Sequence, residues 1–234
     1  MIKFEHTEVM NFEGAIRGMR NPLESWDKSD SYTCYSMLLD SVDCFECGNY
    51  SDCRGNHTVI GDNDLNLMRR LANAGSDHRK FLRQILVSVD ITAPIYWWKE
   101  MDQYRVGVVT NSCSTMHKIQ AKPIELSDFS IDNFNMDDDY NEIDLEDMFI
   151  NVIADCEFLR KKYLETKDKR YWRALIQLLP ESYNQKRTVT LNYEVLRNIR
   201  NSDRKTHKLD EWRVGFMDWI DSLPYAEDLL IDRR

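Results

Sequence analysis

The clearest pattern in this chain is at 84–91, QILVSVDI, where Ile85, Val87, Val89 and Ile91 alternate with Gln84, Leu86, Ser88 and Asp90. Alternation with a period of two is typical of a strand with one buried face. After it, Thr92 offers a helix N-cap, and Pro94 suits the first turn, where a missing N–H costs little. We therefore expect a strand, a tight turn and a helix in this part of the chain.

Apolar residues spaced three and four apart predict helices on both sides of this strand. Residues 10–20 have such spacing, and Asn21-Pro22 should end that helix. A second helix can be capped by Asp62 or Asn63 and stopped by Gly75. Its apolar stripe consists of Leu65, Met68, Leu71 and Ala72. Helical spacing returns over residues 148–179 with a break near 166–169, so the last third should be mainly helical.

Three segments lack a sustained period. Residues 32–62 are rich in Cys, Gly, Asn, Asp and Ser, which predicts an irregular excursion long enough to be a lid or a pinned loop. Residues 106–122 are rich in small and hydroxyl-bearing side chains, which suggests a loop near a ligand. Residues 127–147 are acidic and predict a solvated linker. The length of 234 residues favours one domain, 1–234.

Composition narrows the class of protein. Hydrophobic residues make up 42% and charged residues 30%, as in ordinary globular proteins. A formal charge of −9 argues against a general nucleic-acid binder, because the phosphate backbone repels an acidic surface. No stretch approaches the roughly 18 apolar residues of a membrane span, and the N-terminus lacks a signal-like apolar region. These features predict a cytoplasmic protein.

Six cysteines without a secretion signal favour free thiols or metal ligands over a disulfide framework. Four of them match the ligand count of a zinc ribbon but not its usual spacing: Cys34, Cys44, Cys47 and Cys53. One hypothesis is therefore a zinc-pinned interaction protein whose function lies in residues 32–62. Free thiols are the simpler alternative.

Residues 91–105, ITAPIYWWKEMDQYR, place an Ala-Pro turn and a helix directly after the strand. His78 lies upstream of the strand, and Leu179-Pro180 lies far downstream. Further residues then follow in a fixed order: Asn192, Asn198, Arg204, His207 and Glu211-Trp212-Arg213. Together these motifs resemble the flavin-dependent thymidylate synthase family, over a little under half of the chain. In that family the helix ends in an Arg-His-Arg triplet, which Gln103-Tyr104-Arg105 matches in position.

The resemblance implies an α+β fold with a central β-sheet flanked by helices, and a homotetramer with shared active sites. It implies bound FAD and methylation of dUMP to dTMP, with methylenetetrahydrofolate as carbon donor and NADPH as hydride source. Arg204 would be the catalytic residue, because its guanidinium would stabilise negative charge on a pyrimidine ring. Gln103 and Ser114 would contact the substrate. Ser114 matches a serine of the family if the alignment allows one inserted residue before it.

The cofactor residues implied by the resemblance are His78, Arg105, Asn192, Asn198 and His207. Most of them have a simpler interpretation as well. His78 could be an ordinary polar cap and Arg105 could stabilise a helix dipole. The two asparagines could be one surface cap and one surface side chain. Trp97 and Trp98 could stack on a ligand, although one of two adjacent aromatic residues is usually in the core.

Departures from the family pattern widen the range of functions. Gln103 and Tyr104 replace two basic residues, and Ile176 stands where the family has an arginine. These changes remove groups that bind phosphate. A relative acting on a modified pyrimidine, and a catalytically silent flavin or nucleotide binder, therefore remain alternatives to a plain thymidylate synthase.

Overall fold

The computed structural model describes residues 2–34, 57–134 and 145–232. The chain divides into two compact units, each built from separate segments. The first unit comprises Met1–Thr7, Val89–Val189 and Lys208–Phe216, and the second comprises Glu8–Ser88, Thr190–His207 and Met217–Arg234. Strands β1 (Lys3–Met10), β4 (Leu86–Pro94) and β6 (Asn184–Asn192) contribute residues to both units.

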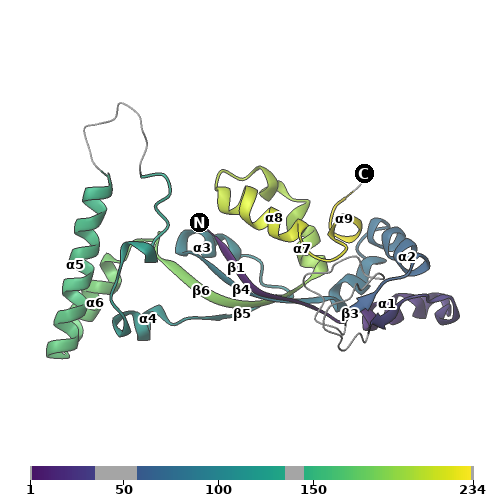
Figure 1. Cartoon of the computed structure of the whole chain (residues 1–234), viewed down its shortest axis with the longest axis horizontal. Coiled ribbons are helices and arrows are strands. Elements are labelled where there is room, and N and C mark those ends of the chain that lie inside the picture. The colour runs from purple at the N-terminus through teal and green to yellow at the C-terminus, as the bar shows by residue number, and fades with distance from the viewer. Residues whose placement is uncertain (1, 35–56, 135–144, 233–234) are drawn as a thin grey trace, which may run out of the picture. The chain divides into compact units, whose positions relative to one another are not determined.

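These strands form a four-stranded sheet in the order β1-β4-β6-β5, with β5 (Val109–Ser112) at one edge (Figure 1). A separate two-stranded sheet pairs β2 (Tyr32–Cys34) with β3 (His57–Val59) in antiparallel register. Helices and strands are both present in quantity, so the predicted α+β class is confirmed.

Strand β4 confirms the alternation seen in the sequence. Val87, Val89 and Ile91 are buried, whereas Ser88 and Asp90 on the other face are half-exposed. The predicted N-cap at Thr92 is wrong, because the strand continues to Pro94 and α3 (Ile95–Met101) begins directly after it. The first two N–H groups of α3 instead donate to the carbonyls of Tyr183 and Glu181, at 3.1 and 3.2 Å. The adjoining chain thus replaces a side-chain cap.

Helices dominate the second unit. In chain order they are α1 (Phe12–Arg20), η1 (Asn21–Leu23), η2 (Trp26–Lys28), α2 (Asp62–Asn73), η3 (Arg79–Gln84), α7 (Tyr193–Arg200), η6 (Asp203–Thr206), α8 (Met217–Asp221) and α9 (Ala226–Leu229). The predicted end of α1 at Asn21-Pro22 is confirmed by the change to a tighter 3-10 turn. Gly75 follows α2 with φ +110°, the left-handed conformation expected of a helix stop.

The start of α2 differs from the prediction. Gly61 is the N-cap, and neither Asp62 nor Asn63 caps the helix. The carboxylate of Asp30 does so from outside the helix, accepting from the backbone N–H groups of Asn63 at 2.9 Å and Asp64 at 3.1 Å. A Cβ at Gly61 would collide with Asp30, so this position suits glycine. The cap is therefore a tertiary contact.

The first unit holds two groups of buried apolar residues. Around α3, Trp97 and Trp98 are fully buried, and Trp97 stacks on Trp212 at a centroid distance of 4.9 Å. Both tryptophans are thus core residues. Trp212 lies in a π-helical turn, η7 (Glu211–Phe216). The indole N–H of Trp98 donates to the Gln185 carbonyl at 2.9 Å, which satisfies one polar group of this core.

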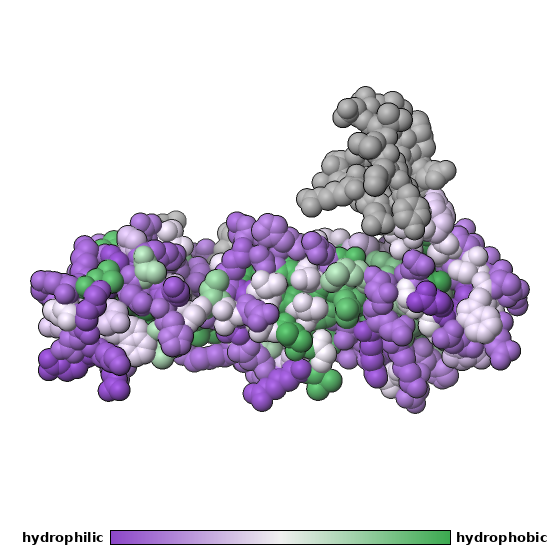
Figure 2. All heavy atoms as spheres, turned by 90° about the horizontal axis from the view of Figure 1, so that it is seen from below, coloured by the Kyte–Doolittle hydropathy of each residue, from purple (hydrophilic) through white to green (hydrophobic). Residues whose placement is uncertain are grey.

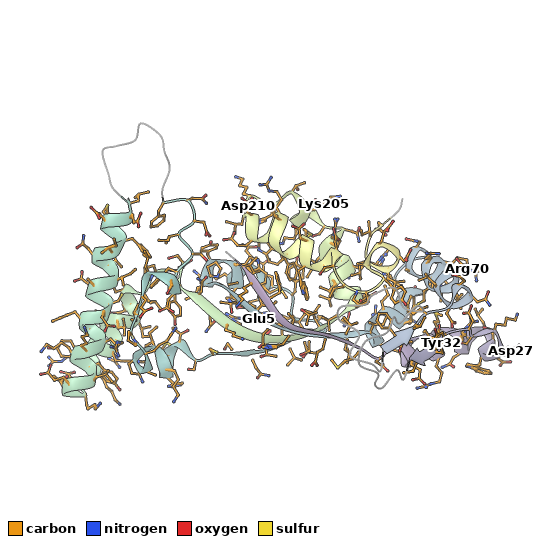
Figure 3. All side chains as sticks on the ribbon, in the orientation of Figure 1. Glu5, Asp27, Tyr32, Arg70, Lys205 and Asp210 are labelled. Carbon is orange, nitrogen blue, oxygen red and sulfur yellow. The ribbon has the colours of Figure 1, made fainter. Side chains whose placement is uncertain are left out.

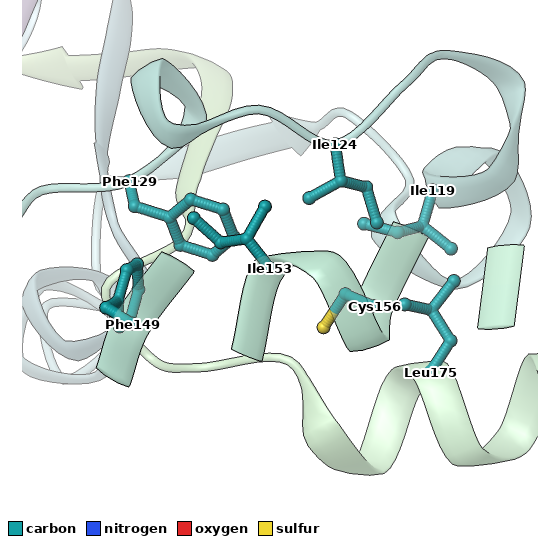
Figure 4. Packing of buried hydrophobic residues seen from close by; sticks show 7 residues of the cluster. All are labelled: Ile119, Ile124, Phe129, Phe149, Ile153, Cys156 and Leu175. Atoms are coloured by element: carbon teal, nitrogen blue, oxygen red, sulfur yellow. The ribbon is translucent and has the colours of Figure 1, made fainter. Parts of the chain in front are cut away.

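The other group packs around α5 (Leu145–Thr166) and α6 (Lys169–Leu178), which lie side by side (Figure 1). The short elements α4 (Thr115–Lys118), η4 (Ile119–Ala121) and η5 (Leu126–Asp128) precede them. Figure 4 shows the cluster: Ile119, Ile124, Phe129, Phe149, Ile153, Cys156 and Leu175. The predicted break near 166–169 is confirmed, because Lys167 has φ +60° between the two helices.

Two parts of the sequence prediction missed strands. Strand β6 lies in the last third, which was expected to be mainly helical, and its first half, NQKR, is too polar to show an apolar alternation. Strands β2 and β3 lie in the excursion 32–62, and at three residues each they are too short to show a period. Strand β5 and α4 likewise occupy the segment expected to be a loop.

Hydrophilic residues cover most of the face seen in Figure 2. Within the ranges that the structure describes, no helix is long and apolar enough to cross a membrane.

Candidate functional site

Two arginines of η3 converge on one carboxylate of α7 in the second unit. Arg79 Nε lies 3.4 Å from Glu194 Oε1, and Arg83 contacts both oxygens of the same carboxylate through Nε and Nη2. Glu194 is buried, whereas the side chain of Arg83 is 54% exposed. The pairing raises the pKa of Arg83 above its usual value. One carboxylate lies between two guanidiniums, and the charge of Asp77 also acts on Arg83.

Asn198 and His78, both expected at a cofactor site, border this ion cluster. Asn198 Oδ1 accepts from Arg79 Nη2 at 3.3 Å. His78 caps η3 directly before Arg79, and its backbone N–H donates to Gly75 O at 3.2 Å. Both side chains are exposed. Over the residues that the structure describes, neither the His78 ring nor the Asn198 amide nitrogen donates a hydrogen bond, so both groups can bind a ligand.

Asn192 stands at the start of α7, where its Oδ1 accepts from the backbone N–H of Val195 at 3.1 Å. It is an N-cap, as one of the two interpretations of the sequence proposed, but it is buried and not at the surface. The cap occupies this side-chain oxygen. A contact between Asn192 and a cofactor stays a prediction.

Arg204 and His207 share one 3-10 turn. The backbone N–H of Arg204 donates to Ser202 Oγ at 3.2 Å, and that of His207 donates to Arg204 O at 3.1 Å. Both side chains are half-buried in the second unit. The turn brings these two predicted site residues together through local geometry alone.

The remaining predicted site residues belong to the first unit. Gln103 Nε2 donates to Glu100 at 3.2 Å, and Arg105 Nε donates to the Asp102 carbonyl at 3.2 Å. Both side chains are exposed, and Arg105 retains its terminal guanidinium N–H groups. Ser114 is the N-cap of α4 and accepts from His117 N at 3.1 Å.

Two motifs that carried the resemblance also have structural roles in the first unit. The Tyr96 hydroxyl donates to the Glu211 carboxylate, and burial together with this contact raises the pKa of Tyr96 above its usual range. The Tyr104 ring lies 6.1 Å from that of Trp212. The middle position of the altered triplet therefore packs beside an aromatic core.

The ion cluster contains three residues that the sequence prediction did not select: Arg79, Arg83 and Glu194. Arg79 and Arg83 lie in a 3-10 helix, in which residues four apart do not share one face, so their spacing alone gave no signal. The position of Glu194 opposite them gave none either, because it depends on how α7 packs on η3.

The metal hypothesis has no support in the described residues, among which no group of three or more His, Cys, Asp or Glu side chains could hold a metal ion. Cys34 ends β2, and Cys44, Cys47 and Cys53 lie outside the described residues. The zinc site stays a prediction.

No family model and no curated protein matches this chain. Solved structures do. Two crystal structures of thymidylate synthase X (ThyX) from Helicobacter pylori, with FAD and dUMP, align at a TM-score of 0.60 and 17% identity. The alignments cover 98% of this chain and 96% or 97% of the other. A UMP/dUMP methylase, PolB from Streptomyces cacaoi bound with 5-Br UMP, aligns at a TM-score of 0.49 and 11% identity. That alignment covers 84% of this chain and 74% of the methylase, and the likeness is too weak to support a conclusion.

The expected resemblance is therefore confirmed in three dimensions, across nearly the whole length of both chains. This chain has the fold of the flavin-dependent thymidylate synthases.

Proposed function

We propose that this protein binds FAD and transfers a one-carbon unit to a pyrimidine deoxynucleotide, in the manner of a thymidylate synthase acting on dUMP. The observation that carries the proposal is a group of exposed side-chain N–H groups at η3 and α7, from His78, Arg83 and Asn198, that donate to no other described residue. They occur in a chain whose fold matches enzymes crystallised with FAD and dUMP.

The chemistry of these donors fits an anionic cofactor. Arg83 uses Nε and Nη2 on Glu194, which leaves Nη1 to bind phosphate or a flavin carbonyl. Glu194 lies between the two guanidiniums, fixes both and reduces the repulsion between them. His78 and Asn198 add further donors beside it. Bound FAD would supply hydride-transfer chemistry.

The other roles follow from the predicted residues. Arg204 and His207 would act from their shared turn, Arg204 on negative charge of the pyrimidine and His207 on the cofactor. Arg105, Gln103 and Ser114 would contact ligands from the first unit. Methylenetetrahydrofolate as carbon donor, NADPH as electron donor, assembly as a homotetramer and a cytoplasmic location belong to the same proposal.

The test is FAD binding by the purified protein, followed by NADPH oxidation with and without dUMP. We expect bound flavin, faster flavin reduction when dUMP is present, and formation of dTMP when methylenetetrahydrofolate is added. Arg83→Ala and Asn198→Ala should each weaken FAD binding about tenfold, since each removes a polar contact to the cofactor. Arg70→Ala, an exposed arginine of α2 in the same unit, is the matched control (Figure 3).

A protein that binds no FAD, or whose FAD affinity responds equally to Arg83→Ala and Arg70→Ala, would contradict the proposal. Rescue of a thymidine auxotroph tests the reaction in cells, with Arg204→Ala as the inactive control.

A catalytically silent or repurposed flavin binder is the second candidate. It is favoured by the altered triplet, in which Gln103 binds Glu100 and the Tyr104 ring lies near Trp212, so neither position offers a cation. This candidate predicts FAD binding with no effect of dUMP on flavin reduction. The two candidates therefore differ in one measurement.

A further inference from the structure

Arg187 is a half-buried arginine of the first unit that lies outside every motif of the resemblance. It belongs to β6, which runs between β4 and β5 in the sheet (Figure 1). Its guanidinium carbon lies 4.2 Å from the centroid of the fully buried Trp98 ring. A guanidinium over an aromatic face is attracted by the ring and held in one orientation. Arg187 therefore presents a charge whose position is fixed.

One side of Arg187 faces the end of α3, where the altered triplet begins. Nη1 donates to Asp102 Oδ1 at 2.8 Å. Asp102 ends α3 directly before Gln103, and its backbone carbonyl accepts from Arg105 Nε at 3.2 Å. The side chains of Gln103 and Arg105 are exposed. A cation thus lies next to the place where the triplet has lost its first basic residue.

The other side of Arg187 reaches the segment of Ser114, the second residue expected to contact the substrate. Arg187 Nε donates to Gln185 Oε1 at 2.9 Å. The Gln185 amide in turn donates to Cys113 O at 2.8 Å and to Thr115 Oγ1 at 3.0 Å, on either side of Ser114. Hydrogen bonds therefore join Arg187 to both segments that were expected to contact the substrate.

The guanidinium of Arg187 keeps capacity for a ligand. Nε and Nη1 donate as described, whereas Nη2 donates to none of the residues that the structure describes. Asp102 is 52% exposed, so water screens the attraction of its carboxylate for Arg187. A guanidinium is well suited to phosphate, because its N–H groups form charge-assisted hydrogen bonds with phosphate oxygens.

We propose that Arg187 binds the phosphate of the nucleotide substrate, in place of the basic residues that the triplet has lost. The inference rests on the function proposed above, since it concerns the substrate of that reaction. Under it, the protein still prefers a nucleoside monophosphate to the free nucleoside, although neither Gln103 nor Tyr104 carries a charge. Arg187 is then a residue that determines substrate specificity.

The test is titration calorimetry of the purified protein with dUMP and with deoxyuridine, which lacks only the phosphate. We expect dUMP to bind more tightly than deoxyuridine. Arg187→Gln should weaken dUMP binding about tenfold to a hundredfold, through loss of a charge-assisted hydrogen bond, and should leave deoxyuridine binding unchanged. Arg187→Lys should recover part of the loss, because a positive charge remains. A purely structural role of Arg187 would weaken the binding of both ligands alike.

Two further variants serve as controls. Asp102→Asn keeps an oxygen that accepts from Arg187 but removes a negative charge near the phosphate, so this variant should bind dUMP at least as tightly as wild type. Arg170→Gln is the matched control, because Arg170 is an exposed arginine of α6 in the same unit and pairs with Asp168 at 2.6 Å. It should change the affinity for neither ligand. Circular dichroism of each variant checks that it is folded.

Unchanged dUMP affinity in Arg187→Gln would overturn the inference, as would equal losses for dUMP and deoxyuridine, or no dUMP binding by the wild type at millimolar concentration. Failure of the proposed function looks different. A protein that binds no FAD, but whose dUMP affinity depends on Arg187, would reject the flavin chemistry and uphold this phosphate contact. A flavoprotein that forms dTMP and whose dUMP affinity does not depend on Arg187 would reject the contact alone.

Discussion

Replacing Asp64 by asparagine should destabilise the second unit strongly. The side chain is fully buried, and its carboxylate is the only charge partner that the described structure gives to the buried guanidinium of Arg20. Five groups donate to it: Arg20 Nε (2.6 Å), Ser29 Oγ (2.7 Å), Ser31 Oγ (2.6 Å), Asp30 N (3.2 Å) and Ser31 N (3.1 Å). Asparagine has nearly the same shape but no charge, and its NH₂ group would face donors.

The size of the effect follows from the buried pair. Removing one partner of a buried ion pair leaves an uncompensated charge and typically costs about 3–5 kcal/mol. Whole domains are stable by only about 5–15 kcal/mol, so the loss is large. Urea unfolding followed by tryptophan fluorescence measures it. Asp62→Asn, an exposed carboxylate in the first turn of the same helix, is the matched control and should cost less than about 1 kcal/mol.

The pH dependence provides a second check. Burial raises the pKa of Asp64, but hydrogen bonds from Ser31, Ser29 and Arg20 outweigh it, so the folded pKa lies below the usual value. A carboxylate with a lowered folded pKa stabilises the protein above its unfolded pKa of about 3.9, and this stability is lost as the pH falls through the folded value. A loss under about 1 kcal/mol at pH 7, or a difference that does not shrink in acid, would refute the reasoning.

Three further predictions follow from the contacts. Glu157→Gln should lower the free energy of unfolding by about 1–3 kcal/mol, because it weakens the bidentate contact with Arg160, at 2.6 and 2.7 Å. That contact lowers the pKa of Glu157 to about 2. In thermal unfolding, the difference in stability between variant and wild type should therefore disappear as the pH falls from about 4.5 to about 2. Asn192→Ala should cost about 1 kcal/mol in urea unfolding by removing the α7 cap, and Asn192→Asp should restore most of it, whereas equal losses in both variants would exclude a capping role. Burial raises the pKa of the Cys156 thiol to about 11, so Cys156 should resist iodoacetamide at pH 7 in the folded protein, whereas the exposed Cys113 should react. Mass spectrometry of the labelled peptides measures both reactions, and equal labelling of the two cysteines would contradict the prediction.

Local patterns in the sequence determined several elements of the fold. The alternation in β4, the apolar stripe of α2 and the helix stop at Gly75 all depend on neighbours within a few residues. Backbone geometry links those neighbours directly, so their spacing is sufficient evidence. The Ala-Pro turn and the motifs around it likewise indicated the fold that the solved structures confirm.

Packing decided what the sequence pattern could not. Asp30 caps α2 although it lies 33 and 34 residues before the two backbone N–H groups that donate to it. Strand β6 was missed, because its polar first half forms a strand through its place in the sheet and not through its own apolar pattern. Trp97 and Trp98 were candidates for stacking on a ligand, and both became core.

The candidate site shows the same division. The resemblance supplied His78 and Asn198 as candidate site residues, since it depends on the order and spacing of motifs along the chain. The sequence did not single out Arg79 and Arg83. Only the tertiary structure put Glu194 between the two arginines, and only it placed Arg187 over the Trp98 ring. The physical reason is that the partner of a charge, and the exposure of an aromatic ring, depend on which chain segments pack nearby. Those segments are distant in the sequence.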